Sequence, residues 1–475
     1  MTSKNGRKIF INKIVEQLNL SMQNLDILNN TNSLKYADIL NEGKDSRTIQ
    51  PTLFDFLSYQ RIDLLKNFVD ENPKITALPT FYDDDMASVP VIDEQGNDEF
   101  DSLTIIKHYI TNTYNRIINL NSKKNNTPAV VYAELQKLEF QNPNQDEKYL
   151  KELDELEKKY ADNEAVIEVL AVKAQYYQNK SDEEEVKNNY KKQAFEICQE
   201  GIKRFPAYKR IGLLKNIQNS ILQKNIQISN NSSVKPNSEL KINIQTTNIE
   251  QLQLSVYKVN TTALEYITYK INGSNNKKVS PKATLLETKV IQTKKSNNFS
   301  AIDTVIKIKS ADYGIYEYVV EDKGNTKAEK QAVGGFTVTD LSFIFRGNSK
   351  SLKSNNINDK INEIYVLDRI TGKPYKDVTL HSYNQKWNGK GYNFDLISKV
   401  TTKADGNYVL PNDENNNKYV IFERANDKYF TSQTYSYWYG DYDNPQPQTQ
   451  VSLFTDRSMY RPGNGFFQGN CLCCQ

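Results

Sequence analysis

The spacing of the apolar residues changes near residue 222, and this change constrains the fold more than any other feature of the chain. Before it, apolar residues recur every three or four positions, as in Leu150, Leu153 and Leu156, which is typical of amphipathic helices. After it, apolar and polar residues alternate, as in residues 240–244, which is typical of half-buried strands. The sequence therefore predicts an α+β multidomain chain, with a helical-repeat-like amino-terminal half followed by antiparallel, immunoglobulin-like β-sandwich modules.

The amino-terminal half divides into two helical regions, residues 1–125 and 126–222. In the first region, Pro51 stands at a first-turn position ahead of a predicted helix. The apolar residues of that helix at helical spacing are Leu53, Phe56, Leu57, Leu64 and Phe68. In the second region the helical patterns are shorter and occur in pairs, and they resemble tetratricopeptide-like helical hairpins. Cys198 lies on the last of these patterns and is expected to be a small buried hydrophobe.

The β half divides in a similar way. Residues 223–340 and 341–440 each predict one β-sandwich, and residues 441–450 have the composition of a linker. Within the second sandwich, Asp405-Gly406 predicts a two-residue hairpin turn with positive φ. Residues 451–475 are expected to be the first strand of an incomplete domain with an aberrant cysteine-rich tail. A shifted reading frame or an incomplete gene explains that tail most simply.

The charge and hydropathy of the chain bear on partners and location. The chain has 61 Lys and Arg against 58 Asp and Glu, and its lysine pairs are scattered, so no nucleic acid is expected as a partner. No run of about 18 apolar residues occurs, so no transmembrane segment is expected. The first basic residues precede no apolar core, so no signal peptide is expected and the chain as written would be cytoplasmic.

Three short motifs carry a family resemblance. The first is a strand and turn made of Thr455, Asp456, Arg457, Tyr460, Arg461, Pro462 and Gly463. The second is Thr371-Gly-Lys-Pro374 followed by residues 404–406, and the third is residues 51–57. Together they resemble the amino-terminal part of bacterial alpha-2-macroglobulin-like proteins, in which Thr-Asp-Arg-x-x-Tyr-Arg-Pro-Gly opens one β-sandwich. The resemblance implies that both sandwiches are macroglobulin-type domains and that the first motif is structural.

The same resemblance implies a function. Full-length members of that family are cell-envelope, periplasmic or extracellular proteins that act as broad-range protease traps. A bait segment is cleaved, and in many members an internal thioester then captures the protease. This chain contains neither region, so we expect it to be a non-catalytic scaffold portion of such an endopeptidase inhibitor. Its expected partners are proteases, in the intact family member, and other domains of the parent protein.

No catalytic, cofactor or metal site is expected from the remaining residues. A thioester would place Gln three residues after Cys, but Leu472 stands three residues before Gln475. The tail cysteines are poorly spaced for zinc, and the acidic stretch before Gly96 does not fit a calcium loop. Of the two histidines, His108 is expected to be a partly buried packing residue on a helix, and His381 is expected to lie in a strand.

One aromatic cluster is a candidate contact patch, and it consists of Tyr435, Tyr437, Trp438, Tyr439 and Tyr442. These residues could instead cover the seam between two sandwiches, so both interpretations stay open. Two other functions also stay open. The second motif resembles the regulatory-like sandwiches of cell-surface or outer-membrane binding and adhesion proteins, and the helical half would suit an interaction scaffold.

Overall fold

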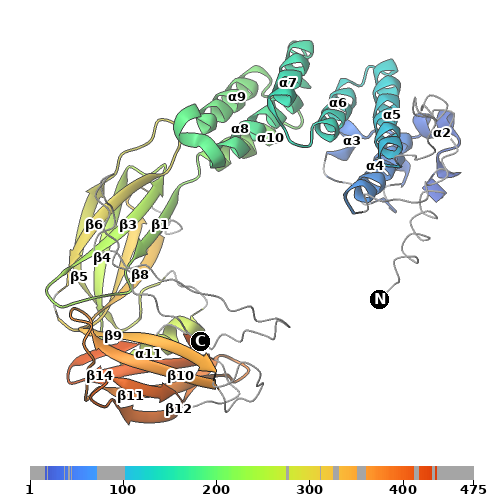
Figure 1. The fold of residues 1–475 in the computed structure, drawn as a ribbon. Helices are drawn as coiled ribbons and strands as arrows, with labels where there is room; N and C mark the ends of the chain where they lie inside the picture. The colour runs from blue at the N-terminus through green and yellow to red at the C-terminus, as the bar shows by residue number, and fades with distance from the viewer. Residues whose placement is uncertain are drawn as a thin grey trace, which may run out of the picture.

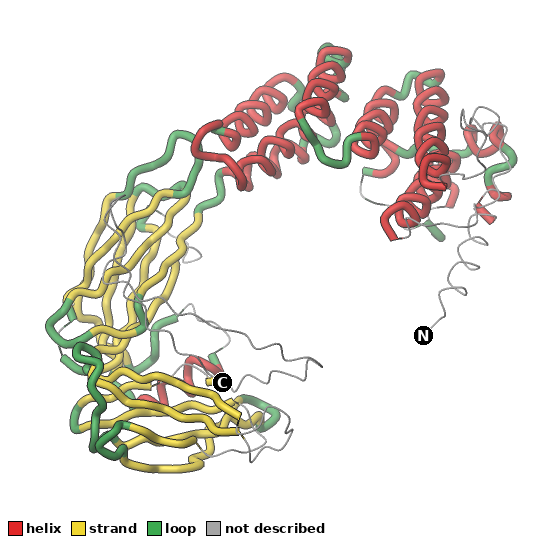
Figure 2. The backbone as a smooth tube through the Cα atoms, in the orientation of Figure 1, coloured by secondary structure: helices red, strands yellow, loops and turns green. Residues whose placement is uncertain are grey.

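The computed structural model describes residues 17–71 and 102–435, apart from gaps at 19, 37, 41–42, 44, 274–277, 311, 325–330, 350–359, 411–416 and 431–433. The described residues form an arc, with the helices in one arm and the strands in the other (Figures 1 and 2). The predicted α+β class, with a helical amino-terminal half followed by strands, is confirmed. No described helix is long and apolar enough to span a bilayer.

The helices of the first arm are short to medium in length. Their bounds are α2 Leu25–Asn30, η1 Ser33–Tyr36, α3 Ser46–Ile49, α4 Leu53–Glu71, α5 Ser102–Lys123, α6 Thr127–Gln141, α7 Glu147–Lys159, α8 Val166–Asn188, α9 Tyr190–Arg204 and α10 Gly212–Ile221.

Helix α4 begins where a reciprocal cap satisfies its free amide groups. The Thr52 hydroxyl accepts a bond from the Asp55 amide at 3.2 Å, and the Asp55 carboxylate accepts from the Thr52 amide at 3.0 Å. The apolar side chains of Phe54, Ile62 and Leu65 in α4 are fully buried and pack against α5. Leu53, Phe56, Leu57 and Leu64 are only half-buried, so the predicted stripe was displaced by about one position. The burial of Phe68 lies outside the described residues.

Helix α8 is the centre of the second helical region. One of its faces packs on α9 and α10 through Ile167, Leu170 and Ala174, and another packs on α6 and α7 through Val169 and Tyr176. Cys198 of α9 is fully buried in the first contact, as predicted. Burial raises the pKa of its thiol to about 12, so it stays protonated and unreactive.

The strands follow from residue 225. Their bounds are β1 Asn225–Asn230, β2 Ser233–Val234, β3 Glu239–Thr247, β4 Gln251–Val259, β5 Ala283–Gln292, β6 Ile302–Lys309, β7 Gly314–Asp322, β8 Gln331–Val338, β9 Leu341–Ser349, β10 Lys360–Asp368, β11 Thr379–Trp387, β12 Tyr392–Thr401, β13 Asn407–Leu410, β14 Asn417–Arg424, β15 Asp427–Phe430 and β16 Thr434–Tyr435.

Two sheets face each other in the first β unit. Among the described residues, one has the order β1-β3-β6 and the other β2-β8-β7-β4-β5. Alternate residues of β3, such as Ile242 and Ile244, meet Leu254 and Tyr318 of the opposite sheet in a continuous core. All described pairings here are antiparallel except β2 with β8.

A second pair of sheets follows, with described orders β13-β10-β9 and β12-β11-β14-β15. Their core contains Ile364, Val366, Leu380 and Phe422. The hairpin predicted at Asp405-Gly406 was wrong, because β12 and β13 belong to opposite sheets and the turn carries the chain across the core.

Helix α11 (Ala263–Asn272) interrupts the β half between β4 and β5, and the alternating pattern did not predict it. Thr262 caps its first turn: the Thr262 side chain accepts from the Glu265 amide, and the Glu265 carboxylate accepts from the Thr262 amide. Such a capping box satisfies two amide groups that the first turn of a helix would otherwise leave unpaired. The helix lies beside the second pair of sheets (Figure 1).

Candidate functional site

The structure leaves most of the sequence-predicted site residues untested. The family motif from Thr455 to Gly463 lies outside the described residues, and so do Tyr437, Trp438, Tyr439 and Tyr442. Tyr435 lies in β16, where it pairs with Asn417 of β14. The candidate sites that the structure does describe are the joints between its parts.

The first joint connects α10 to β1 through residues 222–224. The Asn248 side-chain amide donates to the carbonyls of Ile221 and Gln223, at 2.8 and 3.2 Å. The Lys224 ammonium lies 2.6 Å from a carboxylate oxygen of Asp322, whose side chain is 2% exposed. The turn between β3 and β4 and strand β7 therefore both hold this connection, the first through its backbone carbonyls and the second through the Lys224 side chain.

A loop of the β unit reaches into the helices at the same joint. Phe299, between β5 and β6, packs its ring 4.8 Å from that of Phe195 in α9. Its φ of 63° is strained for a bulky side chain. Asn298 supports this conformation, because its side chain accepts from the Ser300 amide and donates to Asn189 at 3.1 Å.

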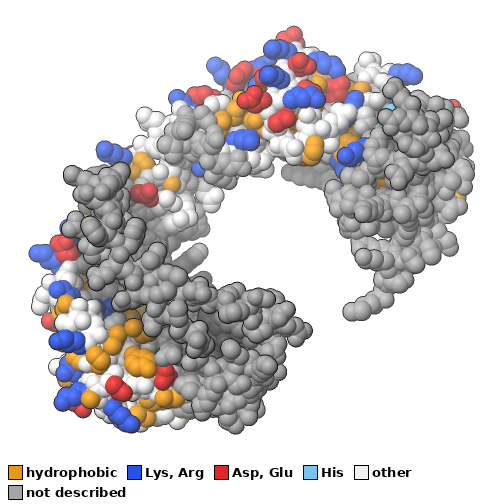
Figure 3. Space-filling model, viewed as in Figure 1, with side chains coloured by type: hydrophobic (Ala, Val, Ile, Leu, Met, Phe, Trp, Pro, Cys, Tyr) orange, Lys and Arg blue, Asp and Glu red, His pale blue; other side chains and the backbone are white. Residues whose placement is uncertain are grey.

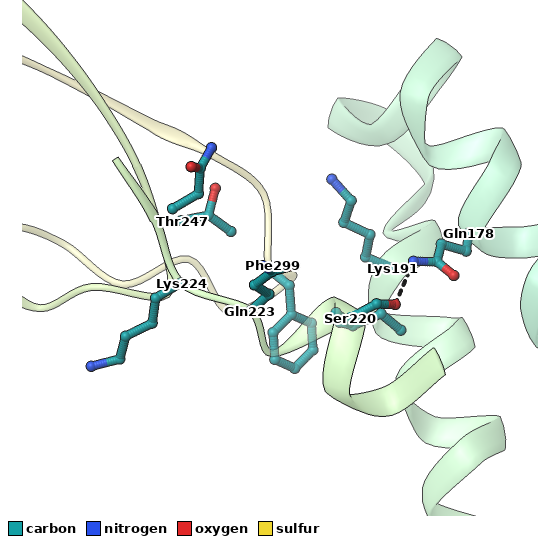
Figure 4. A pocket seen from close by; sticks show the side chains of 9 residues that line it. Gln178, Lys191, Ser220, Gln223, Lys224, Thr247 and Phe299 are labelled. Atoms are coloured by element: carbon teal, nitrogen blue, oxygen red, sulfur yellow. Dashed lines mark hydrogen bonds between the residues drawn. The ribbon is translucent and has the colours of Figure 1, made fainter. Parts of the chain in front are cut away.

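A pocket of about 260 Å³ opens at this joint, between α8, α9 and α10 and the first strands (Figure 4). Its walls are Gln178, Lys191, Ser220, Ile221, Gln223, Lys224, Asn225, Thr247 and Phe299. Gln178 donates to the Ser220 hydroxyl at 2.8 Å. These side chains offer amides, hydroxyls, two ammonium groups and an aromatic ring. Such a set can form hydrogen bonds, but it pairs no nucleophile with a general base.

A buried ion pair ties the helices of the first arm together. The Arg210 guanidinium lies 3.0 Å from the Glu168 carboxylate of α8, which also accepts from the Tyr208 hydroxyl at 2.8 Å. Arg210 also lies 3.8 Å from Asp45, next to α3. Burial raises the pKa of Glu168 even though Arg210 opposes the shift. The cluster therefore joins segments that are distant in the sequence.

The second joint is built around α11, between the two pairs of sheets. Ala263, Tyr266 and Ile267 of this helix pack against Ile315 of β7 and against Tyr419 of β14, with further residues of both units. These strand residues lie on the outer faces of their sheets, so the helix is a wedge between two sandwiches. The contact buries apolar surface on both sides.

A buried acid supports the wedge. The Glu317 carboxylate of β7 is fully buried; it pairs with the Lys270 ammonium of α11 and accepts from the Ser280 amide at 2.7 Å. Because the Lys270 ammonium and the Ser280 amide both contact it, the buried carboxylate is not left without partners. Its role is to hold α11 and the following loop on the sheet.

The connection across this joint is only Thr339 and Asp340. The Asp340 amide donates to Asp427 at 2.9 Å, and Asp340 accepts from the Tyr313 hydroxyl at 2.6 Å. Arg369 donates to the carbonyls of Thr339, at 3.1 Å, and of Leu341. The hydrogen bond to Asp340 raises the pKa of Tyr313 to about 12. Both connecting residues are therefore bonded to strands or loops of the two units.

The two histidines lie on a helix and on a strand, as predicted. His108 is half-buried on α5, and His381 of β11 is 15% exposed with its Nε2 3.2 Å from Glu423. In the part of the chain that the structure describes, no three His, Cys, Asp or Glu side chains converge on a metal-sized site. The charged side chains on the visible face of the helical arm mix both signs (Figure 3).

Sequence reasoning missed both joints. The capping box of α11, Thr262 to Glu265, is readable in the sequence and could have signalled that helix. No sequence signal connects Phe299 to Phe195, because the two lie in different units.

Comparison with known proteins gives distant similarities. No family model and no curated protein matches the chain. A mutant of Salmonella alpha-2-macroglobulin is 13% identical with a TM-score of 0.31, over 51% of this chain and 14% of that chain. Native Escherichia coli alpha-2-macroglobulin is 15% identical with a TM-score of 0.25, over 51% and 15%. The CARDB domain of Pyrococcus furiosus PF1109 is 13% identical with a TM-score of 0.16, over 24% and 87%. Over about half its length, the chain is thus distantly similar in structure to a small part of bacterial alpha-2-macroglobulins.

Proposed function

We propose that this chain is a non-catalytic scaffold arm of a protease-trapping protein of the alpha-2-macroglobulin type. In this role it holds other domains of the parent protein at a fixed spacing, at or outside the cell envelope. The bait and capture chemistry belongs to parts of the parent beyond this chain. The partners of the parent are proteases.

The observation that carries the scaffold role is the construction of the two joints. At the first, Phe299 of the β unit is held among helical residues, and Lys224 pairs with Asp322. At the second, α11 is packed between two sheets, and Arg369 donates hydrogen bonds to the carbonyls of Thr339 and Leu341. A chain of freely moving modules would need none of these contacts, because flexible linkers keep their backbone exposed to water.

The sequence supports the family assignment in this proposal. The motif from Thr455 to Gly463 and the turn at Thr371–Pro374 occur in the order that the resemblance requires. The structure adds a local reason for the turn. Asp368 accepts from the Thr371 amide at 2.7 Å and from the Tyr375 hydroxyl at 2.6 Å, which closes the loop between β10 and β11.

Rigidity can be measured by electron paramagnetic resonance distances. Spin labels at Glu155 of α7 and Lys399 of β12, both exposed, span both joints. The tail cysteines Cys471, Cys473 and Cys474 are replaced by serine, and buried Cys198 is kept. We expect one narrow distance distribution. A broad distribution would show that the modules move independently and would contradict a scaffold arm.

The family assignment needs the native polypeptide. An antibody raised against residues 102–435 can capture it from its source cells for peptide mass spectrometry and protease assays. We expect a longer polypeptide with a Cys-x-x-Gln segment, which protects protein substrates from several proteases while peptide substrates are still cleaved. The 475-residue chain alone should protect neither protein substrates nor peptide substrates from cleavage. A native polypeptide that leaves protein substrates unprotected refutes the trapping role.

A further inference from the structure

The hairpin of β11 and β12 presents an aromatic pair to solvent. Trp387 ends β11 and is 61% exposed, and Tyr392 begins β12 directly opposite and is 37% exposed. Their ring centroids lie 5.0 Å apart in an edge-to-face arrangement. Leu396, on the same face of β12, is 54% exposed. Trp387 thus leaves a large apolar surface in water that the sandwich core does not use.

The hairpin tip is held in one conformation. The Asn388 side chain accepts from the amides of Lys390 and Gly391, both at 2.9 Å, and Gly389 takes a φ of 90°. Asn272, the last residue of α11, clamps the tip from the neighbouring unit. Its amide donates to the Tyr392 carbonyl at 2.7 Å, and its carbonyl accepts from the Tyr392 amide at 2.5 Å. The pair is therefore ordered before any partner arrives, which lowers the entropy cost of binding.

Two lysines flank Trp387 in the sequence. Lys390 lies in the turn and is exposed, and the Lys386 side chain is 58% exposed. One carboxylate, Asp395, lies 2.8 Å from the Lys386 ammonium and reduces its charge. The tip thus combines two amphipathic rings with a net positive charge. That combination suits an apolar boundary next to anionic groups.

We propose that this hairpin tip docks the protein onto a lipid surface that carries anionic headgroups. Trp387 and Tyr392 enter the boundary between headgroups and acyl chains, and Lys390 and Lys386 face the phosphates. A protein partner fits less well, because two aromatic side chains bury about 150–250 Å² each, whereas stable protein interfaces need roughly 800 Å² per partner. A lipid surface has no such minimum area and can accommodate two aromatic side chains.

The chain has two tryptophans, and the test uses the full chain with Trp438→Phe, so that all tryptophan fluorescence comes from Trp387. The probes are vesicles of phosphatidylcholine alone and of equal parts phosphatidylcholine and phosphatidylglycerol. We expect flotation with the anionic vesicles, a blue shift of Trp387 emission and quenching by brominated acyl chains. Trp387→Ala should weaken flotation about tenfold or more. Soluble glycerol phosphate should not compete.

Charge variants separate docking from a folding effect. Lys390→Glu should weaken binding to the anionic vesicles, and Asp395→Asn should strengthen it, with unchanged thermal melting. Ile370→Ala is the matched control, because Ile370 is 63% exposed and precedes β11 at the opposite end of the sandwich. Absent flotation, unshifted emission, or a Trp387→Ala variant that binds like its parent overturns the proposal. The scaffold role does not depend on this result.

Discussion

Phe299 shows how a single residue can join two units at a local cost. Its left-handed backbone is unfavourable by about 1–3 kcal/mol, and its ring compensates by packing among helical residues around Phe195. Asn298 and its serine neighbours hold the loop in this form. Since ring packing offsets the backbone cost, we expect the Phe299 ring, more than the loop backbone, to hold the helices and the β unit together at the first joint.

Replacing Phe299 by alanine should therefore loosen the first joint. We expect a loss of about 1–2 kcal/mol in the free energy of unfolding and a broader distance distribution between labels at Glu155 and Lys307. Phe299→Leu, which keeps apolar bulk, should retain most of the stability and a narrow distribution. Equal broadening in both variants would show that the ring does not hold the joint. Urea denaturation and electron paramagnetic resonance check these outcomes.

Glu168 gives a prediction for pH dependence. Because its pKa is raised in the folded chain, the folded state binds more protons than the unfolded state as the pH falls toward 4.5, the ordinary value for this group. Its contribution to stability therefore increases on acidification. Glu168→Gln removes that contribution and leaves Arg210 without its closest carboxylate, at a cost of about 3 kcal/mol.

The difference in unfolding free energy between the parent chain and Glu168→Gln should thus widen from about pH 8 to about pH 5. Urea denaturation at both pH values measures it. A difference that narrows on acidification would mean that Arg210 outweighs burial and depresses the pKa. Lys148→Gln, which affects an exposed pair on α7, is the control and should leave the pH dependence unchanged.

At the scale of elements, two turns give a matched pair of glycine substitutions. Gly406 and Gly372 have φ values of 68° and 67°, but a Cβ on Gly406 would lie 2.5 Å from the Val366 carbonyl oxygen and one on Gly372 would meet nothing within 4 Å. Both sites strain alanine, and only Gly406 adds a collision with backbone. The difference between the two variants isolates the close approach of the turn at Gly406 to β10.

Gly372→Ala should cost about 1 kcal/mol of unfolding free energy, and Gly406→Ala should cost at least about 2 kcal/mol more. Thermal and urea unfolding of the two variants, side by side, measures this difference. Equal losses would mean that the turn at Asp405-Gly406 shifts away from β10 without penalty. They would also weaken the view that this crossing between sheets is rigidly placed.

The elements also show how far the sequence could lead. Periodicity separated helices from strands, because burial on one face repeats every 3.6 or 2 residues. Periodicity placed the buried stripe of α4 about one position away from where it lies, because the buried residues Asp55 and Ser58 interrupt the apolar pattern. It could not assign Asp405-Gly406 to a crossing between sheets, because a turn sequence specifies local dihedral angles and not strand partners. The joints depend on contacts between residues about a hundred positions apart, such as Phe195 and Phe299, which spacing rules do not reach.

At the scale of the whole molecule, the arc depends on two corners and not on a single core. Each sandwich has its own core, and α11 adds a third apolar cluster between them. Arg369 reinforces the corner between the two sandwiches: it donates to the Thr339 carbonyl of the connection, and its guanidinium stacks over the Tyr429 ring at 5.3 Å. Stability within the units and the angle between them are therefore carried by different residues.

Arg369→Ala should separate the two properties. We expect labels at Lys307 of β6 and Lys399 of β12 to show a broader distance distribution, because the carbonyls of Thr339 and Leu341 lose their donor. Arg369→Lys keeps the charge but not the fork of donors, so it should restore little. An unchanged distribution in Arg369→Ala would assign the angle to α11 alone.

The two-residue connection between β8 and β9 also limits how sequences of this type can diverge. Side chains alternate between the faces of a strand, so one inserted residue at Thr339-Asp340 would reverse which face of β9 meets its core, or force β9 to shift register. Residue identity there can change, provided that the backbone groups find donors and acceptors. The length of the connection cannot change without rebuilding the second sandwich. Related chains are therefore expected to concentrate insertions and deletions elsewhere and to keep this spacing constant.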